Sequence, residues 1–434
     1  MDPLTIGWIC IFAMFVLLPT GVPIAFIMLA VGMVGYVVLE GIAPALGTLR
    51  MVPFSEVATY SFTVIPLFIL MGHVAYNSGL AADLLMLART WLGRIPGGLV
   101  HATIAGCTVF GAMCGSGIAS CATMSKIAVP EMIKLGVDKR LAFGTVAAAG
   151  TLAAMIPPSV IMVIYGIITE QSIGRLLIAG ILPGIVAAIN FMIMVYIRAK
   201  RNPRLAPAVT GITWQQRFTS LKPVASIILI IVVIVGGIYS GICTPTEAGA
   251  VGTFAIFVLG VVQRRMTWGG LKESVLNTLR TTGMIFLIII AAFIFTRMLN
   301  ITGVSTQIVS GINSLDVPPI VILILIMILY LFIGMFMDFL PALFMTLPVV
   351  FPIIMRLGYD PIWFGVLITH LDEMSLITPP FGLNLFVMKG TVPDAEMSDI
   401  IKGVTPFIIV DLVTLAIYIA FPQISLFLPN LMLR

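Results

Sequence analysis

The stretch PEMIKLGVDKRLAFGTVAAAGTLAAMIPP, residues 130–158, has a counterpart 222 positions later in PIIMRLGYDPIWFGVLITHLDEMSLITPP, residues 352–380. The opening proline, a Leu-Gly pair, an aspartate and the closing Pro-Pro pair occupy the same places in both stretches without a gap. The same shift carries Pro23 onto Pro245. We therefore predict that the chain consists of two copies of one unit, which in an apolar chain is typical of a transporter built from paired halves.

The composition indicates a membrane protein. Apolar residues make up 60% of the 434 residues, charged residues make up 9%, and the mean hydropathy is +1.16. Such a chain has too little polar surface to cover a soluble globule. Uncharged runs such as 224–239, 248–262 and 283–296 can cross a bilayer as helices, and they lack the alternation of a barrel strand. The first apolar run, which begins at MDPLTIG, has neither a basic start nor a cleavage site, so we expect no signal peptide.

Other classes of protein fit less well. The net charge of +5 is expected from basic residues on the cytoplasmic side of membrane helices, so we predict no nucleic-acid partner. Cys107, Cys114 and Cys121 stand seven residues apart, but no His, Asp or Glu joins them within a few positions. We expect them to be packing residues rather than a metal site. The chain has no HExxH, no GxSxG and no paired histidines, so we do not expect an enzyme.

A Gly/Ser-rich interruption, CGSGIAS at 114–120, divides the apolar run 101–130. We expect two arms of about 13 and about 10 residues, which are too short to cross a bilayer of about 30 Å at about 1.5 Å per residue. The sequence therefore predicts a re-entrant hairpin at 101–130. The repeat predicts a second hairpin at 318–352, with its tip near 334–341.

The predicted fold is an all-α polytopic membrane protein with an inverted-topology repeat, two re-entrant helical hairpins and two broken helices. The copies are 1–197 and 223–434, and the basic linker 198–222 joins them. Each copy holds five crossings, an odd number, so the second copy is inverted relative to the first. The broken helices are expected at 141–169 and 362–388, and the other crossings near 4–19, 23–39, 60–76, 176–197, 224–240, 247–263, 283–298 and 403–428.

The distribution of charge predicts which side each loop faces. If the linker 198–222 is cytoplasmic, the alternation of crossings places 17 of the 23 basic residues on the same side. Cytoplasmic loops of membrane proteins hold such an excess of Lys and Arg. We therefore expect the hairpin 101–130 to open toward the cytoplasm and the hairpin 318–352 to open toward the periplasm.

The breaks in the helices indicate where ions and substrate bind. Each unpaired backbone group away from water costs several kcal/mol, so such backbone is tolerated where it lines a cavity or binds a ligand. Free carbonyls suit Na⁺, and helix N-termini suit an anionic group. We expect the tip 115–117 to face the break 153–158, and the tip at Asp338 to face 375–380. Gly and Pro also kink packed helices, but two matched pairs in two copies favour binding sites.

Four motifs resemble one transporter family: FGAMCGSGIAS at 110–120, MIPPSVIMVIYG at 155–166, PTEAGAVG at 245–252 and ITPPFGLNLFV at 377–387. Together they resemble, nearly end to end, the large membrane subunit (DctM) of the tripartite ATP-independent periplasmic (TRAP) transporters. The resemblance implies Na⁺-driven elevator import of small organic acids across the bacterial inner membrane. It also implies a DctQ-like small membrane subunit, a DctP-like periplasmic substrate-binding protein, contact with membrane lipid, and no organic cofactor.

The resemblance also implies two sodium sites and a substrate site between the hairpin tips. The family commonly has Ser at the position of Cys114, Gly at that of Ala153 and Asn near Leu371, and ligation by backbone carbonyls would survive these differences. The implied ligands are Gly115, Ser116, Ala153, Ile156 and Pro158 for one sodium ion, Gly334, Asp338, Ser375 and Thr378 for the other, and Ser116, Ser120, Thr151, Asp338 and Asn384 for substrate.

Other polar residues are assigned singly. Glu247 follows Pro245 at a predicted helix start, so we expect it to cap the helix rather than to relay protons. Asp372 and Glu373 either help to hold a cation or pair within the helix. Asp411 has no explanation from the sequence, and we expect the three histidines to be packing or interfacial residues. Two alternative functions stay open, namely an ion-coupled transporter that needs no binding protein and an ion channel.

Overall fold

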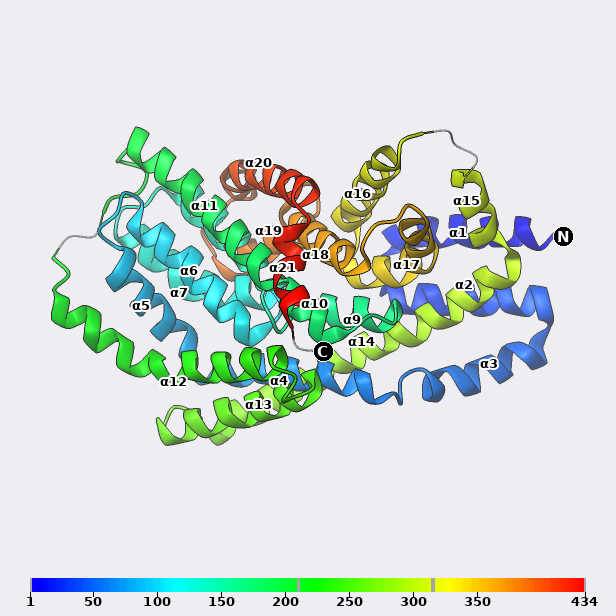
Figure 1. Cartoon of the computed structure of the whole chain (residues 1–434), viewed down its shortest axis with the longest axis horizontal. Coiled ribbons are helices and arrows are strands. Elements are labelled where there is room, and N and C mark those ends of the chain that lie inside the picture. The colour runs from blue at the N-terminus through cyan, green and yellow to red at the C-terminus, as the bar shows by residue number, and fades with distance from the viewer. Residues whose placement is uncertain (1, 209–210, 314–316, 433–434) are drawn as a thin grey trace.

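The computed structural model describes residues 2–208, 211–313 and 317–432, and every regular element in these ranges is a helix (Figure 1). The helices are α1 (Pro3–Leu17), η1 (Leu18–Thr20), α2 (Ile24–Glu40), α3 (Ile42–Ser55), η2 (Tyr60–Thr63), α4 (Val64–Asn77), α5 (Leu80–Leu92), α6 (Gly98–Cys114), α7 (Gly117–Lys134), α8 (Lys139–Thr151), α9 (Val160–Ile168), α10 (Ile173–Ala179), α11 (Ile181–Arg201), α12 (Trp214–Tyr239), α13 (Pro245–Val262), α14 (Trp268–Thr302), α15 (Val304–Asn313), α16 (Pro319–Phe336), α17 (Phe339–Arg356), α18 (Pro361–Ile377), α19 (Leu383–Thr391), α20 (Met397–Ala420) and α21 (Gln423–Leu431).

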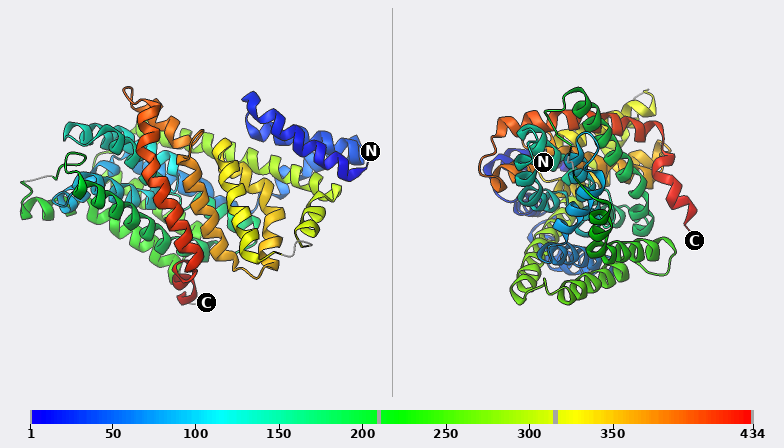
Figure 2. Two further views of the ribbon diagram at one scale, coloured as in Figure 1. Left: turned by 90° about the horizontal axis from the view of Figure 1, so that it is seen from above. Right: turned by 90° about the vertical axis from the view of Figure 1, so that its left-hand side faces the viewer.

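The prediction of an all-α polytopic fold is confirmed. Within the described ranges, seven helices are long and apolar enough to cross a membrane, or eight if the bent pair 42–55 and 60–77 counts as one span. The molecule is elongated, with α1, α2, α3 and α15 at one end and α5, α12 and α13 toward the other (Figure 1). The hairpins and broken helices lie along its length, and α20 runs across its middle (Figure 2).

Local signals explain where several helices begin. Asp138 accepts a hydrogen bond from the Leu141 N–H at 3.1 Å and caps α8, and Asp360 caps α18 in the same way. At α13, the Thr244 N–H donates to Glu247 Oε2 at 2.8 Å while the Glu247 N–H donates to Thr244 Oγ1 at 3.2 Å. This capping box confirms the expectation that Glu247 caps a helix.

The helix boundaries repeat at the offset found in the sequence. The helices α6 and α16 end at Cys114 and Phe336, and α7 and α17 occupy Gly117–Lys134 and Phe339–Arg356. Each pair of boundaries differs by 222 residues. The same secondary structure is therefore built twice around the hairpins.

The expected lengths of the first hairpin arms are wrong. The helices α6 and α7 hold 17 and 18 residues, because α6 begins before His101 and α7 continues through Pro130. The helices α16 and α17 are also long enough to cross a membrane. Arm length therefore does not distinguish these hairpins from pairs of spanning helices. Whether a hairpin is re-entrant depends on whether its tip lies inside the membrane or at its surface.

Other differences from the expected elements are local. Two helices, α3 and the amphipathic α5, lie where no crossing is predicted, and α3 follows α2 directly. Helix extends into both ends of the predicted linker, so that only 202–213 connect α11 to α12. The expected last crossing is divided into α20 and α21, because Pro422 follows the end of α20.

Candidate functional site

The first hairpin tip is a tight turn inside the protein. Gly115 has a φ of +61°, and its N–H donates to the Gly111 carbonyl at 3.0 Å, which closes α6. Ser116 caps α7 by accepting a hydrogen bond from the Ala119 N–H at 3.4 Å. Gly115 is buried and Ser116 is half-buried. The tip therefore ends in the protein interior rather than at the surface.

The first tip rests on the first break. A Cβ atom on Gly115 would collide with the carbonyl oxygen of Pro158. Two further glycines of the hairpin pack as closely: a Cβ atom on Gly111 would lie 2.6 Å from Ala153 Cα, and one on Gly117 would lie 3.2 Å from Thr151 Cα. The structure thus brings together Gly115, Ala153 and Pro158 of the first implied sodium site, because three residues without side chains allow backbone to approach backbone.

The first break leaves its carbonyl oxygens free. Short turns connect Thr151 to Ile156, and the bond between Pro157 and Pro158 is cis. Among the described residues, no N–H or O–H donates to the carbonyls of residues 153–158. Most of this segment is buried, with Ile156 half-buried. Buried carbonyl oxygens of this kind suit a hard cation such as Na⁺.

The second tip and break pack in a similar way. A Cβ atom on Gly334 would lie 2.6 Å from Ser375 Cβ, so the end of α16 touches α18. Asp338 caps α17 by accepting from the Leu340 N–H at 3.1 Å. Ser375 Oγ donates to the Asp372 carbonyl at 2.8 Å, and Thr378 Oγ1 donates to a carbonyl one turn earlier at 2.6 Å. These hydroxyl oxygens keep lone pairs that can face a cation.

Helix ends supply matching partial charges at both places. The C-termini of α6 and α8 meet at the first tip and break, and those of α16 and α18 meet at the second. The helices α7, α9, α17 and α19 begin beside them. C-terminal ends favour a cation and N-terminal ends favour an anion. Each tip and break can therefore attract both a cation and an anionic group.

Three of the five implied substrate residues lie along the seam between α7, α8 and α19. Asn384 reaches from α19 and donates from Nδ2 to the Ala147 carbonyl of α8 at 2.9 Å. The backbone carbonyl of Asn384 accepts a hydrogen bond from Cys121 Sγ of α7 at 3.8 Å. Asn384 Oδ1 and Ser120 Oγ are buried and have no hydrogen-bond partner among the described residues. Buried polar atoms without partners are rare in proteins and suit a polar ligand or water.

Thr151 is the third residue of the seam, and the two remaining implied substrate residues belong to the hairpin tips. Thr151 closes α8 by donating to the Ala148 carbonyl at 2.7 Å. Ser116 belongs to the first tip and Asp338 to the second. In the described part of the chain, no hydrogen bond joins Asp338 to any of the other four substrate residues. Ser120, Thr151 and Asn384 therefore form one polar seam, and Asp338 is not hydrogen-bonded to it.

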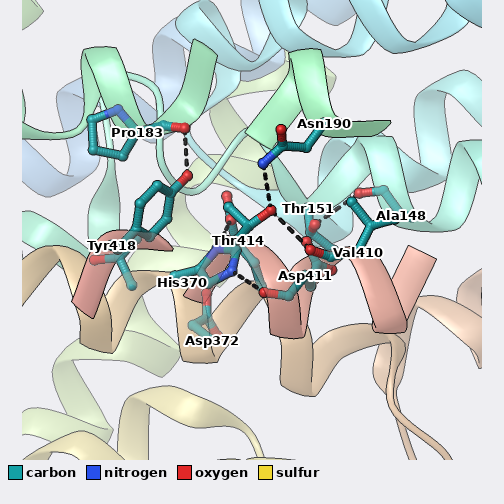
Figure 3. A network of polar contacts seen from close by, with 12 residues as sticks. Ala148, Thr151, Pro183, Asn190, His370, Asp372, Val410, Asp411, Thr414 and Tyr418 are labelled. Atoms are coloured by element: carbon teal, nitrogen blue, oxygen red, sulfur yellow. Dashed lines mark hydrogen bonds and ion pairs between the residues drawn. The ribbon is translucent and has the colours of Figure 1, made fainter. Parts of the chain in front are cut away.

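The sequence failed to identify a buried polar cluster on α18 and α20 (Figure 3). His370 Nδ1 lies 3.1 Å from Glu373 Oε2, and His370 Nε2 lies 3.1 Å from the carbonyl oxygen of Asp411. His370 is buried, as expected of a packing residue, and it also pairs with Glu373 inside α18, which is one of the two alternatives expected for that acid. The spacing of His370 and Glu373, three residues apart on one helix, was a signal that could have found the pair.

Comparisons with known proteins identify the family. Residues 11–424 match the family model described as tripartite ATP-independent periplasmic transporter, DctM component. The C4-dicarboxylate TRAP transporter large permease protein DctM of Pseudomonas aeruginosa is 35% identical over 372 residues, 86% of each chain. The sialic acid TRAP transporter large permease protein SiaM of Vibrio cholerae is 30% identical over 425 residues, 98% of each chain.

A solved structure shows a similar fold. The crystal structure of the Alcanivorax borkumensis YdaH transporter matches with a TM-score of 0.60 at 15% identity, and the match covers 88% of this chain and 89% of that one. This likeness supports the polytopic helical fold alone. The sequence matches extend nearly from end to end. The chain therefore belongs to the DctM family of TRAP transporter large permeases, which are membrane transporters and not enzymes.

Proposed function

We propose that this permease is the large transmembrane subunit of a Na⁺-coupled secondary active importer of small organic acids in the bacterial inner membrane. The main observation is the first tip and break, where Gly115 meets Pro158 and the carbonyls of residues 153–158 are buried without donors. Unpaired backbone at membrane depth is tolerated only where it is buried in protein or lines a cavity, and a bound Na⁺ would supply the partner that these carbonyls lack.

The residues present fit Na⁺ at both places. The first ion would be held by backbone oxygens of Gly115, Ala153, Ile156 and Pro158 with Ser116 beside them. The second would be held by the Asp338 carboxylate and by oxygens of Gly334, Ser375 and Thr378. All of these donors are oxygens, which hard cations prefer. The partial negative charges of four helix C-termini add to the attraction.

The substrate would be a small organic anion at the seam of Ser120, Thr151 and Asn384, with Ser116 and Asp338 approaching from the two tips. The free oxygens of Ser120 and Asn384 can hydrogen-bond its polar groups. The helix N-termini of α7 and α9 offer partial positive charge to a carboxylate or sulfonate. Relatives named for C4-dicarboxylate, sialic acid and isethionate support this class of substrate.

Transport would follow an elevator motion. The hairpins and broken helices, α6–α9 and α16–α19, would move as one body against the other helices, with the hairpin of α6 and α7 open to the cytoplasm and that of α16 and α17 open to the periplasm. Contacts between α7, α8 and α19 hold parts of both copies together. If ions and substrate stabilise the same arrangement, each tightens the binding of the other.

Two partner proteins would complete the transporter, namely a small membrane subunit and a periplasmic substrate-binding protein. The isethionate permease protein DctMQ of Oleidesulfovibrio alaskensis supports the first partner, since its match covers 98% of this chain but 66% of that protein.

Uptake by the reconstituted complex tests the proposal. The permease, its small subunit and its binding protein would be placed in proteoliposomes, and radiolabelled succinate, sialic acid and isethionate would be offered with and without an inward Na⁺ gradient. We expect one class of acid to accumulate only when the gradient and the binding protein are both present. Accumulation that ignores the Na⁺ gradient would show that the coupling proposed here is wrong.

A further inference from the structure

Asp411 is an acid in the interior of the molecule. It lies in the middle of α20, its side chain is 1% exposed, and its Oδ2 atom has no hydrogen-bond partner among the described residues. The described ion pairs of acidic residues with Lys or Arg do not include it. A carboxylate in this position would be a buried negative charge without a matching cation.

The ring of His370 makes no hydrogen bond to the Asp411 side chain. A backbone carbonyl can only accept, so His370 Nε2 must carry a hydrogen that it donates to the Asp411 carbonyl at 3.1 Å. The other ring nitrogen, Nδ1, faces Glu373 Oε2 at 3.1 Å. Both ring nitrogens are therefore engaged by groups other than the Asp411 carboxyl, so His370 lies close to that carboxyl but donates no hydrogen bond to it.

The remaining groups around Asp411 are acidic or uncharged. From α18 it faces Glu373, with Asp372 next in the chain and Asp338 of the second tip beyond. From α20 itself comes Tyr418, whose hydroxyl donates to the Pro183 carbonyl at 2.6 Å. The neighbouring helices α8 and α11 contribute the uncharged Thr151 and Asn190 (Figure 3). Taking up a proton is the available way to remove the buried charge.

We propose that Asp411 is a proton-binding site of this permease, separate from the two proposed sodium sites. Binding forms an O–H bond on a carboxylate oxygen of Asp411 and breaks one in hydronium, and release reverses both changes. Polar groups lie near the acid: Thr414, one turn along α20, accepts a hydrogen bond from Asn190 Nδ2 at 2.9 Å, and Asn190 is half-exposed. Thr414 itself donates to the Val410 carbonyl, so a proton would pass from these groups to Asp411 without a continuous hydrogen-bonded chain.

Infrared spectroscopy of the purified full transporter tests this site without any substrate. A protonated carboxyl group gives a C=O stretching band that moves when the hydrogen is replaced by deuterium. At neutral pH we expect the Asp411→Asn variant to lose one carboxyl group's share of this band. Asp399→Asn is the matched control, because Asp399 lies in the same helix but forms a partly exposed ion pair with Arg140 at 2.8 Å. That variant should keep the whole band.

A second variant keeps the test decisive if Asp411→Asn cannot be isolated. Asp411→Glu retains a carboxyl group but moves it by one methylene, so the band should remain with the same area and a changed frequency. An Asp411→Asn spectrum identical to that of the unmodified protein would overturn the proposal. So would an Asp411→Glu band unchanged in frequency, because the band would then come from another acid.

Discussion

Gly115 and Pro158 meet backbone to backbone: the Pro158 carbonyl oxygen occupies the place where a side chain at position 115 would begin. Replacing Gly115 by Ala should therefore open the first tip and reduce Na⁺-driven uptake at least about tenfold, equivalent to about 1.4 kcal/mol. Gly241→Ala is the control, since Gly241 has a φ of +72° but nothing within 4 Å of the added Cβ. If both variants lost the same amount of uptake, backbone strain rather than the contact with Pro158 would explain the loss.

The contact between Gly334 and Ser375 predicts a compensating pair. A Cβ on Gly334 would lie 2.6 Å from Ser375 Cβ, so Gly334→Ala should lower the apparent melting temperature in detergent. Adding Ser375→Gly should recover part of that loss, because the colliding side chain is removed. Neighbouring residues typically show interaction energies of about 0.5–3 kcal/mol in such double-mutant cycles. Strictly additive effects would contradict the packing described for the second tip.

Asn384 is expected to serve both packing and substrate binding. Asn384→Ala leaves the Ala147 carbonyl without its donor, which should cost about 1–3 kcal/mol of stability. It should also raise the KM for uptake about tenfold or more, or about 1.4 kcal/mol, by removing the free Oδ1. Asn430→Ala, which loses an exposed hydrogen bond to Arg175, should change neither quantity. A normal KM in Asn384→Ala would remove this residue from the substrate site.

Glu247 can be tested as a helix cap against the alternative of a proton relay. Glu247→Gln keeps the capping box, because Gln also accepts a hydrogen bond from the Thr244 N–H. We expect this variant to retain its melting temperature and uptake, and we expect Glu247→Ala to be less stable. A relay acid would instead lose uptake in both variants, and paired measurements of uptake and melting would reveal that outcome.

The proposed inversion of the two copies predicts opposite accessibility for two equivalent exposed positions. Lys134 and Arg356 end α7 and α17 and are related by the 222-residue shift. In a cysteine-free background, Arg356→Cys should react with a membrane-impermeant thiol reagent on the periplasmic side of intact spheroplasts. Lys134→Cys should react only after the membrane is permeabilised. Reaction of both cysteines from one side would mean that the copies are not inverted.

Much of this architecture was predictable because the helix ends carry local signals. The prolines at 157–158 and 379–380, the glycines of the first tip and the capping aspartates Asp138 and Asp360 act on backbone close to them in the chain. Their repetition at one offset identified both hairpins and both breaks. Such signals depend little on what packs against them.

The features that could not be predicted from the sequence depend on contacts between residues that lie far apart in the chain. Asp411 faces residues of α18, 41 positions from His370 along the chain, and no local pattern reports that proximity. The lengths of the hairpin arms depend on whether helix continues beyond His101 and Pro130. In the structure α6 packs against α5 and α7 packs against α8, and such contacts are not visible in the local sequence. The helix α5 was not among the predicted crossings, because its polar face interrupts the run of apolar residues that marks a membrane-spanning helix.

The position of Asn384 bears on how the two halves unfold. Its amide belongs to the second copy, yet it satisfies the Ala147 carbonyl in the interior of the first. A single copy would leave that carbonyl and the seam around it open to lipid. Neither half can therefore bury all of its polar backbone alone, and we expect the two halves to unfold together rather than one after the other.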